Sequence, residues 1–271
     1  MKRIILCADD YGQNKAISQG ILDLLEKNRL SATSCLVNTK IWSTFSQNLK
    51  PYQDKIDIGL HLNLTEGLSL SQEMPAYYRL PELIARSHLR LIKKANVVAE
   101  FNAQIDVFIK AMGFAPRFVD GHQHVHQLPV VRDALLNVYE KRLHTHGTYI
   151  RSTAIPFASN HLNKLSRTLV KQYLIQLTGG KSLHNTMEEL GIPHNSSFGG
   201  IYDFARSNTY ATLFPGFLKD VKNKGLILCH PGLSESENDP IANARANEYA
   251  YFSSDQFLKD LTDAGVELGR F

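Results

Sequence analysis

Short apolar runs of strand length alternate with amphipathic helical stretches along the chain, and this alternation restricts the fold more than any other feature. Residues 3–8 form the first apolar run, and helical spacing follows over residues 16–26. Further strand-like runs lie at 34–37, 56–64, 117–123, 149–152, 225–229 and 265–268, and further helical patterns lie at 97–112, from 129 onward, at 162–177 and at 255–263. Roughly seven such strand–helix units predict parallel strands with crossover helices, in an α/β fold of the distorted TIM-like (β/α) barrel type. A doubly wound open sheet is the alternative, but no GxGxxG motif follows the first run.

Composition narrows the class of protein. The 271 residues carry a net charge of +4 with scattered lysines and arginines, so we expect no nucleic-acid partner. No apolar stretch approaches the ~18 residues of a membrane span and the start does not resemble a signal peptide, so we expect no membrane span and a cytoplasmic location. The three cysteines are far apart and are expected to be buried free thiols. We expect one domain over residues 1–271, in which the Gly-, Ser-, Asn- and Pro-rich stretches 65–81 and 178–197 are long active-site loops.

Acidic and imidazole side chains directly follow four of the apolar runs. They are Asp9 and Asp10, then His61, then His122, His124 and His126, and finally His230. The active site of a barrel forms at the carboxyl ends of its strands, so these side chains are expected to converge on one mouth. In an extended segment the three alternating histidines would share a face, a crowding that packing explains poorly. Asp9 and Asp10 can both reach the mouth only if the strand bends or bulges there, which Gly12 allows.

One carboxylate with two imidazoles suits a catalytic divalent ion that keeps open coordination positions. Zn²⁺ fits the mixture of nitrogen and oxygen donors, whereas Mg²⁺ prefers oxygen alone. Each residue type also has a structural alternative: the two aspartates could form a turn or cap a helix, His61 could be a packed core residue, and His230 could cap a strand. The triple-histidine segment is the part for which a metal or catalytic role is favoured.

Four ordered motifs resemble those of YdjC-like carbohydrate deacetylases. They are Ala8–Gly12 (ADDYG), Gly59–Thr65 (GLHLNLT), Asp120–His126 (DGHQHVH) and Cys229–Gly232 (CHPG), and Arg245–Glu248 (RANE) also fits. The family includes chitooligosaccharide and hopanoid-biosynthesis deacetylases, and its site layout is similar to that of NodB-type polysaccharide deacetylases. The resemblance implies a distorted TIM-like barrel. Tyr11 stands where phenylalanine is common, which preserves an aromatic ring.

The resemblance also implies roles for individual residues. Asp10, His61 and His122 become ligands of one divalent ion, Mg²⁺ or Zn²⁺, and Asp9 becomes the general base. The reaction implied is hydrolysis of the acetamide of an N-acetylated sugar, a linear amide C–N bond, with release of acetate.

Further residues are expected to act at this site, beyond those whose roles the resemblance implies. Arg151 is expected to keep Asp9 ionised. His230 is the first choice for the general acid, with His126 or His124 as the alternative. We expect His124 and His126 to contact the substrate or orient a ligand.

Two other functional classes stay open. A metal-dependent phosphoesterase uses similar ligands, usually with more carboxylates, for which Asp120 and Glu66 are available. A non-catalytic glycan-binding barrel could use the aromatic residues Trp42, Tyr77 and Tyr78. The sequence does not identify the sugar, its chain length, the native metal or the oligomeric state, and it is compatible with a homodimer.

Overall fold

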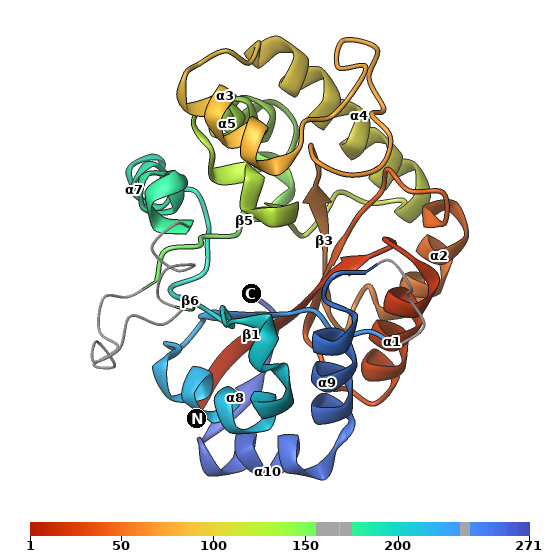
Figure 1. Ribbon diagram of the computed structural model, residues 1–271, viewed down its shortest axis with the longest axis vertical. Helices are drawn as coiled ribbons and strands as arrows, with labels where there is room; N and C mark the ends of the chain where they lie inside the picture. The colour runs from red at the N-terminus through yellow and green to blue at the C-terminus, as the bar shows by residue number, and fades with distance from the viewer. Residues whose placement is uncertain (156–167, 169–174, 234–238) are drawn as a thin grey trace.

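Every strand pairing is parallel, and the sheet curls around a common interior (Figure 1). The computed structural model describes residues 1–155, 168, 175–233 and 239–271. Its strands are β1 (Lys2–Tyr11), β2 (Ala32–Cys35), β3 (Asp57–Leu62), β4 (Phe118–Gly121), β5 (Tyr149–Ile150), β6 (Phe198–Gly199), β7 (Leu226–Cys229) and β8 (Val266–Leu268). They run in the order β5-β4-β3-β2-β1-β7-β6, and β8 pairs with the beginning of β1.

Helices connect the strands and lie outside the curled sheet (Figure 1). They are α1 (Lys15–Glu26), α2 (Trp42–Leu49), α3 (Leu80–His88), α4 (Lys94–Met112), α5 (Pro129–Arg142), α7 (Lys181–Leu190), α8 (Tyr210–Asp220), α9 (Ala242–Ser253) and α10 (Asp255–Asp263). The expected parallel strands with crossover helices are therefore confirmed. None of the helices in the described ranges is long and apolar enough to cross a lipid bilayer.

The connections between strands differ in part from those expected from the sequence. The stretch 178–197 is not one long loop, because α7 occupies ten of its residues, and only the stretch 65–79 stays without a helix. The helix expected over 162–177 lies almost entirely outside the described residues.

Strand β1 is apolar on both faces, and the acidic residues Asp9 and Asp10 lie at its carboxyl end. Ile4 and Leu6 pack outward with the helices, while Ile5 and Cys7 pack with the residues inside the barrel. A strand buried on both sides reads as a continuous apolar run, as the sequence shows. Asp9 continues the inward-facing series of alternate residues. The three cysteines are buried and free, as expected.

A buried asparagine joins the two end strands of the sheet. Asn195 Oδ1 accepts from the backbone N–H of Ser152, which follows β5, at 2.8 Å. Its Nδ2 donates to the carbonyl oxygens of Ser152, at 2.9 Å, and Ser197, which precedes β6, at 2.8 Å. One side chain thus supplies hydrogen bonds across the seam, which an inter-strand ladder would otherwise provide.

Replacing Asn195 with alanine is expected to lower the free energy of unfolding by about 2–4 kcal/mol, because buried backbone groups lose their partners. Ser196→Ala is the matched control, since its hydroxyl lies at the surface and contacts only the carbonyl oxygen of Asn223. The control should change stability by no more than ~0.5 kcal/mol. Urea titration of both variants measures the difference, and equal stabilities would show that Asn195 does not hold the seam.

Candidate active site

β1 brings two adjacent carboxylates to one cleft because its backbone leaves regular strand geometry at Asp10. Between Ala8 and Tyr11, β1 contains one residue more than its partner β2, so the pairing register shifts there. Asp10 has a φ of +70° and Gly12 one of +89°, both in the left-handed region. Adjacent residues of a regular strand face opposite sides, whereas here both Asp9 and Asp10 line the cleft. The bulge expected from the sequence is confirmed.

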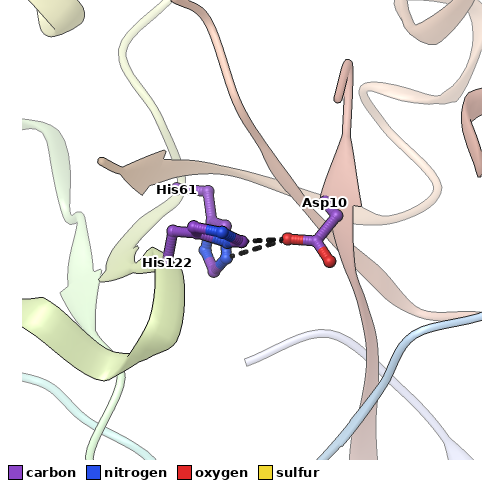
Figure 2. A group of neighbouring side chains, drawn as sticks. All are labelled: Asp10, His61 and His122. Carbon is purple, nitrogen blue, oxygen red and sulfur yellow. Dashed lines mark ion pairs between the residues drawn. The ribbon is translucent and has the colours of Figure 1, made fainter. Parts of the chain in front are cut away.

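The three expected metal ligands meet at this point. Asp10 from β1, His61 from β3 and His122, directly after β4, point toward one another (Figure 2). Asp10 Oδ1 lies 2.9 Å from His122 Nδ1 and 3.5 Å from His61 Nε2. One ligand atom from each residue lies within 4.8 Å of the others, and all three side chains are buried. The fold therefore assembles a carboxylate and two imidazoles from three distant parts of the chain.

Each imidazole has a second carboxylate behind it. Asp120 Oδ1 lies 2.6 Å from His61 Nδ1 and accepts a hydrogen bond from Ser34 Oγ at 2.6 Å. Glu66 Oε1 lies 3.3 Å from His122 Nε2. A carboxylate behind a histidine fixes its tautomer and leaves the opposite ring nitrogen free to bind a metal. The ring nitrogens that face Asp10 Oδ1 are His61 Nε2 and His122 Nδ1.

The charges at this cluster fit a divalent ion. Asp10 Oδ1 is buried without a hydrogen-bond partner. Burial alone would lower the pKa of His61, but Asp120 and Asp10 raise it to about 10. Burial likewise opposes ionisation of Asp10, yet Arg245 and His122 hold its pKa well below the usual range. The cluster thus favours positive charge, and a metal ion that displaces protons from the ligands supplies it.

Arg151 pairs with two carboxylates, Asp9, the expected base, and Asp120, which contacts the expected metal ligand His61. Its guanidinium donates to both carboxylate oxygens of Asp9 at 2.7 Å and lies 2.6 Å from Asp120 Oδ2. The Arg151 side chain has no exposed surface. The expected pairing of Arg151 with Asp9 is present, and the additional pairing with Asp120 connects Asp9 to the orientation of His61.

The triple-histidine segment is not extended. β4 ends at Gly121, and His122–Gln127 form a 3-10 turn in which Gln123 and His124 have φ values of +53° and +59°. The expectation that the three imidazoles share one face is therefore wrong, because the turn separates them. Gly121 makes this close return feasible, since a Cβ atom at this position would lie 2.7 Å from the backbone nitrogen of His126.

The turn gives His124 and His126 different environments. His124 lines the cleft, and its ring meets the edge of Phe198 at a centroid distance of 5.8 Å. His126 is fully buried away from the cleft surface, with Nε2 3.1 Å from the carbonyl oxygen of Arg151. Burial lowers the pKa of His126 to about 4, so the ring is neutral near pH 7. His124 thus faces the cleft, whereas His126 contacts the backbone of Arg151.

Helix α9 supports the part of the cleft formed by the ends of β1 and β7. His230 lines this part, and its backbone N–H donates to Glu248 Oε2 at 2.5 Å. The hydroxyl of Tyr202 donates to Glu248 Oε1 at 2.6 Å. Arg245, one turn earlier on α9, donates to Asp10 Oδ2 at 2.8 Å. The same helix therefore fixes both a metal ligand and the segment that carries His230.

The cleft has a volume of about 690 Å³ and lies along the carboxyl ends of the strands. Pockets of ~300–1,000 Å³ hold small organic ligands, so a short saccharide fits in size. Apolar side chains such as Leu80, Ile201 and Phe204 share its lining with the polar cluster. Trp42 does not line it, because this residue is buried and stacks on Phe108.

The family profile described as YdjC-like protein matches residues 3–263. The chain belongs to the YdjC-like family. A carbohydrate deacetylase of Danio rerio is 32% identical over 188 residues, which cover 64% of this chain and 58% of that protein. A chitooligosaccharide deacetylase of Yersinia enterocolitica is 28% identical over 135 residues, 48% of this chain and 53% of that protein. The YdjC-like chain thus spans about half the length of the curated relatives it matches.

Solved structures confirm the barrel fold of this YdjC-like protein. An Enterococcus faecalis V583 protein, provisionally described as a cellobiose-phosphate cleavage protein, superposes with a TM-score of 0.73 at 19% identity, over 99% of this chain and 97% of that one. The peptidoglycan N-acetylglucosamine deacetylase Bc1960 gives a TM-score of 0.55 at 11% identity, over 99% and 86%. At these identities the similarity establishes the shared fold.

Several residues around the site received no role in the proposed metal cluster from the sequence, although some of them belong to its motifs. They are Ser34, Glu66, Asp120, Arg245 and Glu248. Asp120 sits within the triple-histidine motif, so its position near the metal cluster could be inferred. Arg245 and Glu248 are spaced three residues apart on one helix face, which is a weak signal that they act together. Ser34 gives no signal in sequence, because only the fold shows that it contacts Asp120.

Asp120→Asn is expected to weaken metal binding by about 10–100-fold, because His61 keeps its position but loses the charged partner that increases its basicity. His61→Ala should instead abolish tight binding by the cluster of Asp10, His61 and His122. Titration of the metal-free proteins with Zn²⁺ measures both affinities. Equal losses in the two variants would show that Asp120 is itself a ligand.

The effect of Glu248→Gln on the free energy of unfolding is expected to depend on pH. Burial raises the pKa of Glu248 from 4.5 to about 7. As pH rises between these values, the unfolded chain ionises while the folded protein stays protonated, so the wild type loses roughly 3 kcal/mol of stability. The variant lacks this titration, so its stability relative to wild type should increase from pH 4.5 to pH 7.5. Thermal melts across this range provide the test, and a constant difference would contradict it.

Proposed function

We propose that residues 1–271 act as one catalytic domain that hydrolyses the acetamide of an N-acetylated sugar and releases acetate. The substrate class is an N-acetylglucosamine-containing oligosaccharide or glycoconjugate. The observation that carries this proposal is the convergence of Asp10, His61 and His122 beside Asp9 in a saccharide-sized cleft. Deacetylase relatives within the same family support it.

Asp10, His61 and His122 would hold one divalent ion. When bound, such an ion polarises a carbonyl group and lowers the pKa of a coordinated water. The mixed nitrogen and oxygen donors favour Zn²⁺ over Mg²⁺, which prefers an all-oxygen shell.

Asp9 is the general base in this proposal. The two hydrogen bonds from Arg151 fix both of its oxygens, which orients the carboxylate to accept a proton from the attacking water. Because Asp9 lines the cleft and Arg151 lies behind it, the carboxylate can reach the water while the guanidinium only positions it.

The leaving amine requires a proton, and His230 is placed to supply it. It lines the cleft directly after β7, the strand that pairs with β1, and an imidazole is suited to proton transfer near neutral pH. Its backbone bond to Glu248 fixes the position of the segment. His124 also lines the cleft and is the second candidate, whereas the buried His126 is assigned to positioning Arg151.

A two-metal phosphoesterase is a weaker alternative. Asp9, His61 and Asp120 also lie close enough to hold an ion. However, Arg151 forms ion pairs with both of these aspartates, and its positive charge disfavours a second cation at that place. The arrangement therefore favours one ion and hydrolysis of an amide.

The decisive assay measures acetate release from N,N'-diacetylchitobiose by metal-reconstituted protein, with and without chelator, beside phosphate release from a generic ester. We expect chelator-sensitive acetate release. His61→Ala and His122→Ala should each bind one ion fewer than the wild type and lose activity while remaining folded by circular dichroism. Phosphate release without acetate release would replace the deacetylase proposal, and an unchanged number of bound ions in both variants would refute the ligand assignment.

Asp9→Asn and Asp10→Asn should fail in different ways. Asp9→Asn cannot accept a proton but keeps the ligand set, so it should bind metal normally and lose kcat by about 10²–10⁴-fold with little change in KM. Asp10→Asn should bind metal weakly, so that excess metal restores part of its activity. Metal titration and steady-state kinetics on both variants separate the roles. The reverse pattern would exchange base and ligand, and full activity in both would refute the mechanism.

A further inference from the structure

A second group of metal-ligating side chains lies outside the cleft. His184 and Glu188 are one helical turn apart on α7, and His194 follows in the segment between α7 and β6. One ligand atom from each of the three lies within 4.8 Å of the others. None of them lines the active-site cleft, so this group is separate from the catalytic cluster.

The hydrogen bonds of His194 leave a ligand nitrogen facing Glu188. Its Nδ1 lies 2.7 Å from the carbonyl oxygen of Ile192, which can only accept a hydrogen bond, so Nδ1 carries the proton. Its Nε2 lies 2.9 Å from Glu188 Oε1. In the neutral ring this nitrogen is an acceptor, and so is the carboxylate oxygen. A metal ion between these two acceptors would satisfy both of them.

His184 completes a ligand set rather than a simple ion pair. Its ring lies perpendicular to that of His194, with centroids 5.0 Å apart. Its Nδ1 lies 3.1 Å from Ser152 Oγ, a contact that orients the ring. Two imidazoles and one carboxylate with an open position form a ligand set that zinc uses in proteins.

The position of the group suggests what an ion would stabilise. His184 contacts Ser152 just after β5, while His194 precedes Asn195, whose side chain joins β5 to β6. The backbone N–H of Ile150 in β5 also donates to the carbonyl oxygen of Pro193 at 3.0 Å. An ion held here would therefore connect α7 to the segment that closes the seam between the end strands.

We propose that His184, Glu188 and His194 form a second site for Zn²⁺, which stabilises the β5–β6 seam independently of catalysis. Binding to the folded state alone raises its stability. The exposed end of this site is Glu188, whose side chain is 65% exposed, so the ion is expected to exchange with solvent more readily than one in the buried cleft.

The test uses the His61→Ala background, in which the catalytic cluster is disabled. This protein is loaded with zinc and dialysed, and its metal content is measured by mass spectrometry. It should retain one ion per chain. Zn²⁺ should also raise its melting temperature. Adding His184→Ala or His194→Ala should weaken Zn²⁺ binding by more than about 100-fold, beyond the usual effect of a supporting residue. Glu188→Gln should weaken it too, whereas Glu189→Gln, its exposed neighbour without a ligand position, should not.

The outcomes separate this site from the proposed catalytic function. Full retention of zinc in the His184 and His194 variants would overturn the second site, as would binding only at millimolar Zn²⁺. A His194–Glu188 ion pair without metal would show no zinc-dependent change in melting temperature, and that also overturns it. The deacetylase proposal is untouched by these results, because variants of the second site in the wild-type background should keep their acetate-releasing activity.

Discussion

The buried guanidinium of Arg151 is the interaction on which the site depends. A charge without exposed surface is costly unless it is paired and hydrogen-bonded, and removing one partner leaves an uncompensated charge. Arg151 is paired with Asp9 from β1 and Asp120 from β4. It therefore requires that both strand ends and its own segment after β5 be in place together. The same contacts orient the proposed base and, through Asp120, the ligand His61.

The charges of the cleft are balanced only when a cation is present. Asp9, Asp10, Asp120 and Glu66 outnumber the guanidiniums of Arg151 and Arg245 around the ligand cluster. The pKa values of His61 and His122 rise despite burial because these carboxylates attract protons. A site that concentrates negative charge in this way competes for a divalent ion against protons, so metal affinity should fall at acidic pH.

The sequence predicted the parts of this structure that follow from strand geometry. Asp10, His61 and His122 could be placed together because parallel strands end at one edge, and the bulge at Asp10 followed from the alternation of side chains. The turn after Gly121 could not be predicted, because left-handed conformations at Gln123 and His124 oppose local preference. The supporting roles of Arg245 and Glu248 depend on how α9 docks, which no local pattern specifies.

Residues with a left-handed backbone conformation lie at or next to two of the three expected metal ligands. Asp10 itself, and Gln123 and His124 after His122, adopt a conformation that costs roughly 1–2 kcal/mol for each residue other than glycine. Such strain persists only when surrounding contacts determine the backbone. Here Arg245 holds Asp10, and the side chain of Gln123 donates to Glu66 at 3.1 Å. These protein contacts therefore maintain the strained backbone that brings the expected ligands together.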